Sequence, residues 1–84
     1  MMEYENYLAN EKLRKERDRI EKYAGDCVAQ GAIVMMINYK LGIVEKEEVS
    51  YYILKLQETG ELEQVYRYLQ THKILPANYI GIFI

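Results

Sequence analysis

The chain has 84 residues, with 11 basic and 13 acidic side chains and a formal net charge of −2. This length suits one small domain over residues 1–84, which we expect to be marginally stable alone, so oligomerisation is a natural expectation. The slightly acidic balance lacks the positive charge that binders of nucleic-acid backbones usually carry, and it makes nucleic acid the less favoured partner.

The sequence shows no feature that directs the chain into or across a membrane. A single cysteine, Cys27, allows no disulfide within the chain, and the N-terminal residues do not resemble a secretion signal. The one candidate membrane stretch, AIVMMI at 32–37, is far shorter than the roughly 20 apolar residues that span a bilayer. We therefore expect a cytoplasmic protein that makes no contact with a membrane.

The first predicted element is a short helix over residues 2–9, where Tyr4, Tyr7 and Leu8 share one helical face. A long central helix is predicted next, because apolar residues recur at an interval of seven, at Leu13, Ile20, Cys27, Val34 and Leu41. Leu8 is out of phase with this stripe by about 140°. A break near Asn10, a good capping residue, would explain the offset.

Two glycines interrupt the long stripe, and each costs about 1 kcal/mol relative to alanine in a helix interior. One alternative is a kink at Gly25-Asp26, with Asp26 capping a new helix. Another is the close approach of a neighbouring helix at Gly31. A third is a strand over AIVMMINY, which holds β-branched residues. Helix is favoured, because the seven-residue spacing runs through this stretch and a period of two does not appear.

Two short amphipathic helices are predicted after Gly42, which suits the left-handed end of the central helix. The first begins with an acidic turn at residues 45–48 and ends at Thr59-Gly60, and the second opens at Glu61 and ends near His72. Together they form an αα-hairpin. Their expected buried stripes are Val49, Tyr52, Ile53 and Leu56 in the first, and Leu62, Val65, Tyr66 and Leu69 in the second.

The C-terminal stretch, ILPANYIGIFI, has no charged side chain. We expect a short extended segment that packs on the helices, pairs as an edge strand or docks on another subunit. The predicted fold is thus all-α, with a long central helix, a C-terminal αα-hairpin and an apolar extended end.

No set of residues in the sequence supports catalysis or metal binding. The chain has one Ser, one Cys and one His, namely Ser50, Cys27 and His72, which is too few for a catalytic triad or a structural zinc site. Cys27 is interpreted as a small core residue, with an interchain disulfide or a reactive thiol as alternatives. His72 is interpreted as a helix-end cation or surface residue. We expect no catalytic residue, no metal and no cofactor.

The most basic segment is residues 12–22, KLRKERDRIEK. It favours a solvated helix with ion pairs four residues apart, such as Lys12 with Glu16 and Arg14 with Asp18. The alternative is a nucleic-acid-binding face made of Lys12, Arg14, Lys15 and Arg19. Groove reading by the C-terminal hairpin is not expected, since its second helix would present Glu61 and Glu63 to phosphates.

Nine tyrosines in 84 residues indicate a binding surface, because tyrosine offers a large contact area at low entropic cost. Tyr51, Leu54 and Tyr68 fall off the main stripes and are the candidate partner-binding residues. The alternative is ordinary packing inside the monomer.

The favoured hypothesis is a non-enzymatic protein-interaction module, an oligomeric regulator or inhibitor of a larger protein, of the kind that phages or mobile elements encode. Its homo-oligomer interface would be the stripe of Leu13, Ile20, Cys27, Val34 and Leu41. The alternatives are a small helical RNA- or DNA-binding protein that uses the basic segment, and an oligomer that sequesters a small ligand.

Overall fold

A computed structural model describes residues 2–24 and 28–84, and the side chains of residues 10–22 and 28–84. The elements are α1 (Met2–Ala24), α2 (Val28–Lys40), α3 (Lys46–Thr59), α4 (Leu62–His72) and a 3-10 helix, η1 (Ala77–Phe83). No β-strand occurs in these two ranges, so the prediction of a mainly helical protein is confirmed. None of the helices in the same ranges is both long and apolar enough to cross a membrane.

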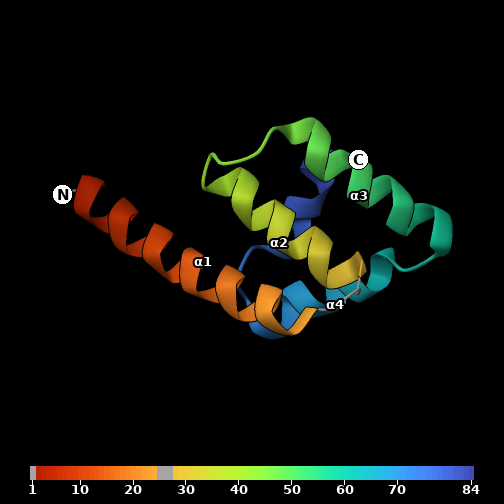
Figure 1. Ribbon diagram of the computed structural model, residues 1–84, viewed down its shortest axis with the longest axis horizontal. Coiled ribbons are helices and arrows are strands. Elements are labelled where there is room, and N and C mark those ends of the chain that lie inside the picture. Colours follow the sequence, from red (N-terminus) through yellow and green to blue (C-terminus); the bar gives the residue numbers. More distant parts are fainter. Residues whose placement is uncertain (1, 25–27) are drawn as a thin grey trace.

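In place of one long central helix, the chain forms α1 and α2, which lie side by side and run in roughly opposite directions (Figure 1). The prediction of one helix through residues 13–41 is therefore wrong, because its apolar stripe belongs to two helices that face each other. The predicted break near Asn10 is also wrong, since α1 continues through it. The predicted kink and cap at Gly25-Asp26 lie outside the described residues.

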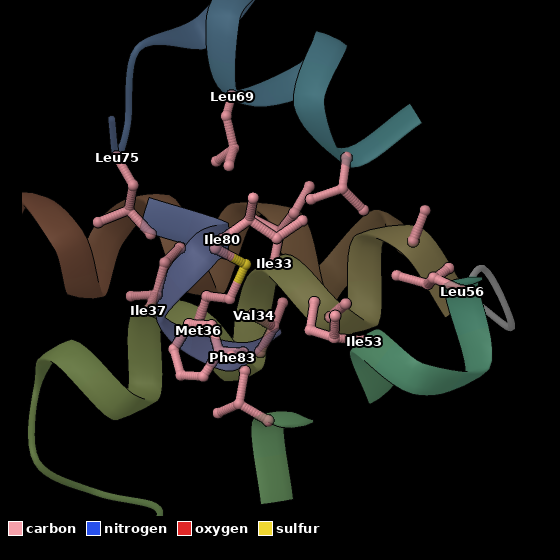
Figure 2. Packing of buried hydrophobic residues seen from close by; sticks show 14 of the residues in the cluster. Ile33, Val34, Met36, Ile37, Ile53, Leu56, Leu69, Leu75, Ile80 and Phe83 are labelled. Atoms are coloured by element: carbon pink, nitrogen blue, oxygen red, sulfur yellow. The ribbon is translucent and has the colours of Figure 1, made fainter. Parts of the chain in front are cut away.

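The stretch AIVMMINY is helical, as favoured from the sequence, and it lies at the centre of the fold. The buried residues of α2 are Ala29, Ala32, Ile33, Val34, Met36 and Ile37. They point to several sides of the helix, so α2 packs against α1, α3 and α4 at once. Figure 2 shows α2 side chains meeting Leu69, Ile80 and Phe83 from other elements.

The helices α3 and α4 form the predicted hairpin, and their ends have the expected chemistry. At the start of α3, the backbone N–H of Glu45 donates to the carboxylate of Glu48 at 3.0 Å. Gly42 and Gly60 adopt left-handed conformations, with φ of 77° and 75°, after α2 and α3. Both buried stripes are largely as predicted, with Val49, Ile53, Leu56, Val65 and Leu69 in the core and Tyr52, Leu62 and Tyr66 packed at its edge.

The apolar C-terminus packs on the helices of its own chain. Ile80 and Phe83 of η1 are buried, and the Phe83 ring meets Tyr39 of α2 edge-on, with centroids 5.2 Å apart. Of the three alternatives for this segment, packing on the helices is therefore confirmed. The expected extended conformation is wrong, because residues 77–83 coil into a 3-10 helix after Pro76 and so bury side chains against both α3 and α4.

Candidate functional site

The three predicted partner-binding residues do not form one surface. Tyr51 and Leu54 share the outer face of α3, with side chains 58% and 55% exposed, and the Lys55 ammonium lies 4.6 Å from the centre of the Tyr51 ring. Tyr68 of α4 instead packs against the core, and its ring lies 4.1 Å from that of His72. Tyr68 is therefore not part of the exposed face of α3 that carries Tyr51 and Leu54.

The predicted oligomer stripe lies largely inside the single chain. Leu13, Ile20 and Val34 are only 8%, 3% and 8% exposed, because α1 and α2 cover one another, and Leu41 is half-buried. Cys27 lies outside the described residues. The reason for expecting a second subunit along this stripe was an uncovered apolar ridge, and the chain's own packing removes that reason.

The arginines of the basic segment are engaged with neighbouring carboxylates. Arg14 pairs with Glu11 at 3.1 Å and Arg19 with Glu16 at 2.7 Å, one turn back along α1 in each case. Pairing with Glu16 raises the pKa of Arg19. The predicted pairs of Lys12 with Glu16 and of Arg14 with Asp18 do not form. Glu16 pairs with Arg19 instead, and Asp18 pairs with Arg17.

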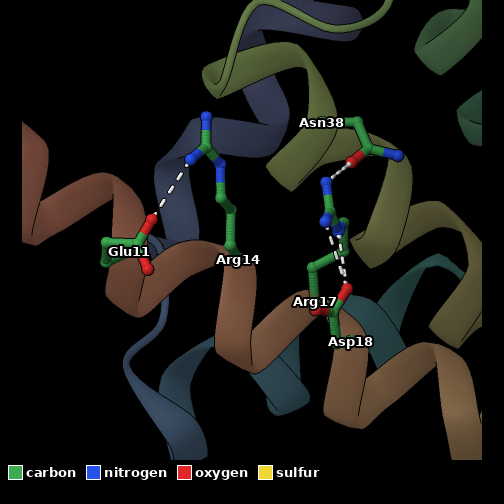
Figure 3. Close-up of polar contacts among 5 residues, drawn as sticks. All are labelled: Glu11, Arg14, Arg17, Asp18 and Asn38. Carbon is green, nitrogen blue, oxygen red and sulfur yellow. Dashed lines mark hydrogen bonds and ion pairs between the residues drawn. The ribbon is translucent and has the colours of Figure 1, made fainter.

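Arg17 joins α1 to α2. Its guanidinium contacts Asp18 at 3.1 Å and donates to the side-chain oxygen of Asn38 on α2, also at 3.1 Å (Figure 3). The side chain is mostly shielded from solvent, unlike that of Arg14. This arginine therefore has a structural role and is not available as a phosphate contact.

The lysines of the same segment line an open groove of about 480 Å³. Lys12 and Lys15 on α1 share this lining with Lys40 at the end of α2 and Lys73 after α4. The groove's other lining residues are Leu13, Glu16, His72, Ile74, Leu75 and Pro76. We call this feature the basic groove. It combines a cationic rim with an apolar floor.

The charge of the basic groove is poorly compensated. Glu16 is its one carboxylate, and that group is held by Arg19, outside the groove lining. Among the side chains that the structure describes, none of the four groove lysines forms an ion pair. Lys40 contacts an aromatic ring, with its ammonium 5.7 Å from the centre of Tyr79. The site can therefore attract an anionic group from solvent.

The end of α4 positions two of the groove residues. Lys73 is the C-cap, and its backbone N–H donates to the carbonyl of Leu69 at 3.0 Å. It adopts φ of 54°, a left-handed conformation that costs a residue with a side chain roughly 1–2 kcal/mol. Residues 73–76 then connect α4 to η1, and together with α1 they line the groove.

Only two of the four groove lysines are predicted from the sequence to be candidate binding residues. Lys12 and Lys15 were candidates in the basic segment, whereas Lys40 and Lys73 belong to no predicted site. The separation of Lys12 from Lys73 is 61 positions, so no local spacing could join them. The available signal was that Lys40 and Lys73 end α2 and α4 with no acidic residue within four positions, and it becomes informative only once the helices are arranged in space.

No group of three or more His, Cys, Asp or Glu side chains suitable for a metal ion occurs in the described parts of the chain. Comparison of the sequence with protein-family models and with characterised proteins, and of the structure with solved structures, gave no match.

Proposed function

We propose that this chain is a non-enzymatic protein-interaction module that holds an acidic segment of a partner protein in the basic groove, and that it regulates or inhibits the partner in this way. One observation supports the proposal most directly. Among the side chains that the structure describes, the four groove lysines form no ion pair and share the groove lining with apolar residues, and the Glu16 carboxylate in the same lining is paired with Arg19.

The two chemical parts of the groove favour a peptide over a simple anion. Beside the buried Leu13 and Leu75, the half-buried Ile74 and the exposed Pro76 leave apolar surface that an aliphatic or aromatic side chain of a ligand could cover. The lysines around them would attract glutamate or aspartate side chains on either side of that residue. A segment that alternates acidic and apolar residues meets both demands, whereas phosphate or sulfate alone meets one.

Nucleic acid is the second candidate, because two members of the predicted nucleic-acid-binding set, Lys12 and Lys15, lie in the groove. The other two, Arg14 and Arg19, are paired with carboxylates and would have to leave them to contact phosphates. The four lysines also line a single groove of about 480 Å³, which suits a short ligand better than a duplex.

Fluorescence anisotropy with labelled probes tests the proposal. We expect a peptide of alternating glutamate and leucine to bind, and a lysine-leucine peptide of equal length not to bind. The triple variant Lys12→Gln/Lys15→Gln/Lys73→Gln should weaken binding of the acidic peptide at least tenfold, about 1.4 kcal/mol.

A matched control separates the groove from net charge. Lys22, Lys46 and Lys55 lie outside the groove lining, and Lys22→Gln/Lys46→Gln/Lys55→Gln changes the total charge equally. This variant should bind nearly as well as the wild type. Equal losses in both variants would contradict the proposal, and tighter binding of a labelled DNA or RNA oligonucleotide at the same salt concentration would favour the second candidate.

A further inference from the structure

The basic groove opens beside the part of α1 that extends away from the rest of the molecule. The first turns of α1 project beyond the other helices (Figure 1), and the molecule measures 43 Å along its long axis against 24 and 21 Å across. These turns continue a helix of 23 residues and extend past the other elements. The start of α1 is therefore accessible to a second molecule.

The sequence of this projecting segment matches the chemistry of the groove. Residues 2–9, MEYENYLA, contain Glu3 and Glu5 and no basic side chain. The same eight residues include two tyrosines and a leucine. An acidic segment interspersed with apolar residues is the ligand that the lysine rim and the apolar floor favour.

The segment cannot reach the groove of its own chain. Residues 2–9 and the groove residues 12–16 belong to one uninterrupted helix, so the segment points away from the groove that lies beside its continuation. A second copy of the chain has no such restriction. The acidic segment and the groove therefore fit each other only between two molecules.

We propose that residues 2–9 of one chain occupy the basic groove of a second copy, and that the second chain does the same in return, forming a symmetric dimer that covers its own binding sites. Two α1 helices would lie antiparallel, with the two-fold axis near residues 9 and 10. Glu5 and Arg14 are nine positions apart, about 14 Å along a helix. With the axis at this position, Glu5 of one helix lies opposite residue 14 of the other, so each acidic segment lies beside Lys12 and Lys15 of the other chain. Both halves of the contact are then the same, as an isologous interface requires.

This inference rests on the proposed function, because one groove accepts an acidic segment in both cases. The start of α1 then competes with the partner protein for the groove. Dilution or a high partner concentration opens the dimer, and the contact, being small and between charged groups, weakens with added salt.

A charge exchange between two variants tests the dimer. Glu3→Lys/Glu5→Lys gives a basic segment with a basic groove, and Lys12→Glu/Lys15→Glu gives an acidic segment with an acidic groove. In sedimentation velocity, each variant alone should be shifted toward monomer about tenfold relative to the wild type. Mixed one to one, they should dimerise again, since each segment then meets a groove of opposite charge.

The control for this exchange is Lys46→Glu/Lys55→Glu, which makes the same charge change as Lys12→Glu/Lys15→Glu on α3. It should dimerise like the wild type. Circular dichroism verifies that every variant is folded. A wild-type chain that is monomeric even at about 1 mM, or folded variants whose mixture stays monomeric, would overturn the inference.

The acidic peptide separates the two proposals. The Glu3→Lys/Glu5→Lys variant keeps its groove and leaves it open, so it should bind the peptide more tightly than the wild type wherever the wild type is mostly dimeric. Peptide binding by a wild-type chain that never dimerises would end the inference and leave the proposed function. Recovery of the mixed dimer without any peptide binding by this variant would end the proposed function alone.

Discussion

The two helices α1 and α2 lie side by side but are held in the fold by different means. Of the 13 residues of α2, six are buried, and they contact three other helices. Among residues 10–22 of α1, whose side chains the structure describes, only Leu13 and Ile20 are buried, and all the others except Asn10 are charged. Helix α2 is thus specified by apolar contacts on several sides. Helix α1 is attached along one seam and presents its charges to solvent and to the basic groove.

The largest effect on stability is expected when a buried side chain of α2 is shortened. Ile37 is fully buried in α2, and Ile37→Ala should lower the free energy of unfolding by about 2–5 kcal/mol, a large share of the stability of so small a protein. Leu13→Ala on α1 should fall at the lower end of that range, since Leu13 borders the open groove and solvent can fill the space it leaves. Urea unfolding followed by circular dichroism measures both, and a greater loss for Leu13→Ala would contradict the comparison.

The hairpin of α3 and α4 is the region that the sequence predicts best. Acidic residues before residue 49, the glycines at the helix ends and Pro76 are local signals, and each acts within a few residues of its position. The apolar stripes of these two helices are narrow, so their buried faces follow directly from spacing. Gly60 and Lys73 end α3 and α4 within one or two residues of the predicted ends.

The pairing of α1 with α2 could not be predicted in the same way. A stripe with an interval of seven is the same whether one helix carries it or two antiparallel helices share it. Within α2, apolar residues cover most of the helix, and such a helix gives no single direction for its neighbours. The groove depends on this pairing, because Lys40 and Lys12 line the same groove only when α2 runs back along α1. Half of the candidate site was therefore hidden until the tertiary arrangement was known.

A smaller effect on stability is expected from the hydrogen bond that joins α1 to α2. Arg17→Met keeps most of the side-chain stem but removes the hydrogen bond to Asn38, and it should lower the free energy of unfolding by about 1 kcal/mol. Arg14→Met is the matched control on the same helix. Its exposed pair with Glu11 should contribute about 0–0.5 kcal/mol. Equal urea midpoints for the two variants would show that the link between α1 and α2 contributes no more than a surface ion pair.

The smallest expected effect is a pH dependence of stability that comes from Tyr79 in η1. Tyr79 of η1 lies beside Phe83, with ring centroids 5.8 Å apart, and burial, reinforced by the nearby Tyr39, raises the pKa of Tyr79. The unfolded chain therefore loses this proton at a lower pH than the folded chain does. The stability that Tyr79 contributes is fully present below the ordinary tyrosine pKa of about 10 and is lost as pH rises through the higher folded value.

Replacing Tyr79 by phenylalanine isolates this contribution. The urea midpoint of the wild type should fall more between about pH 8 and about pH 11 than that of Tyr79→Phe, since the variant has no proton to lose at this position. The difference between the two tyrosinate absorbance titrations should likewise appear above about pH 10. A difference that appears below that pH would mean that the ring is not shielded by η1 and α2, and that the C-terminus is attached to the core as loosely as α1.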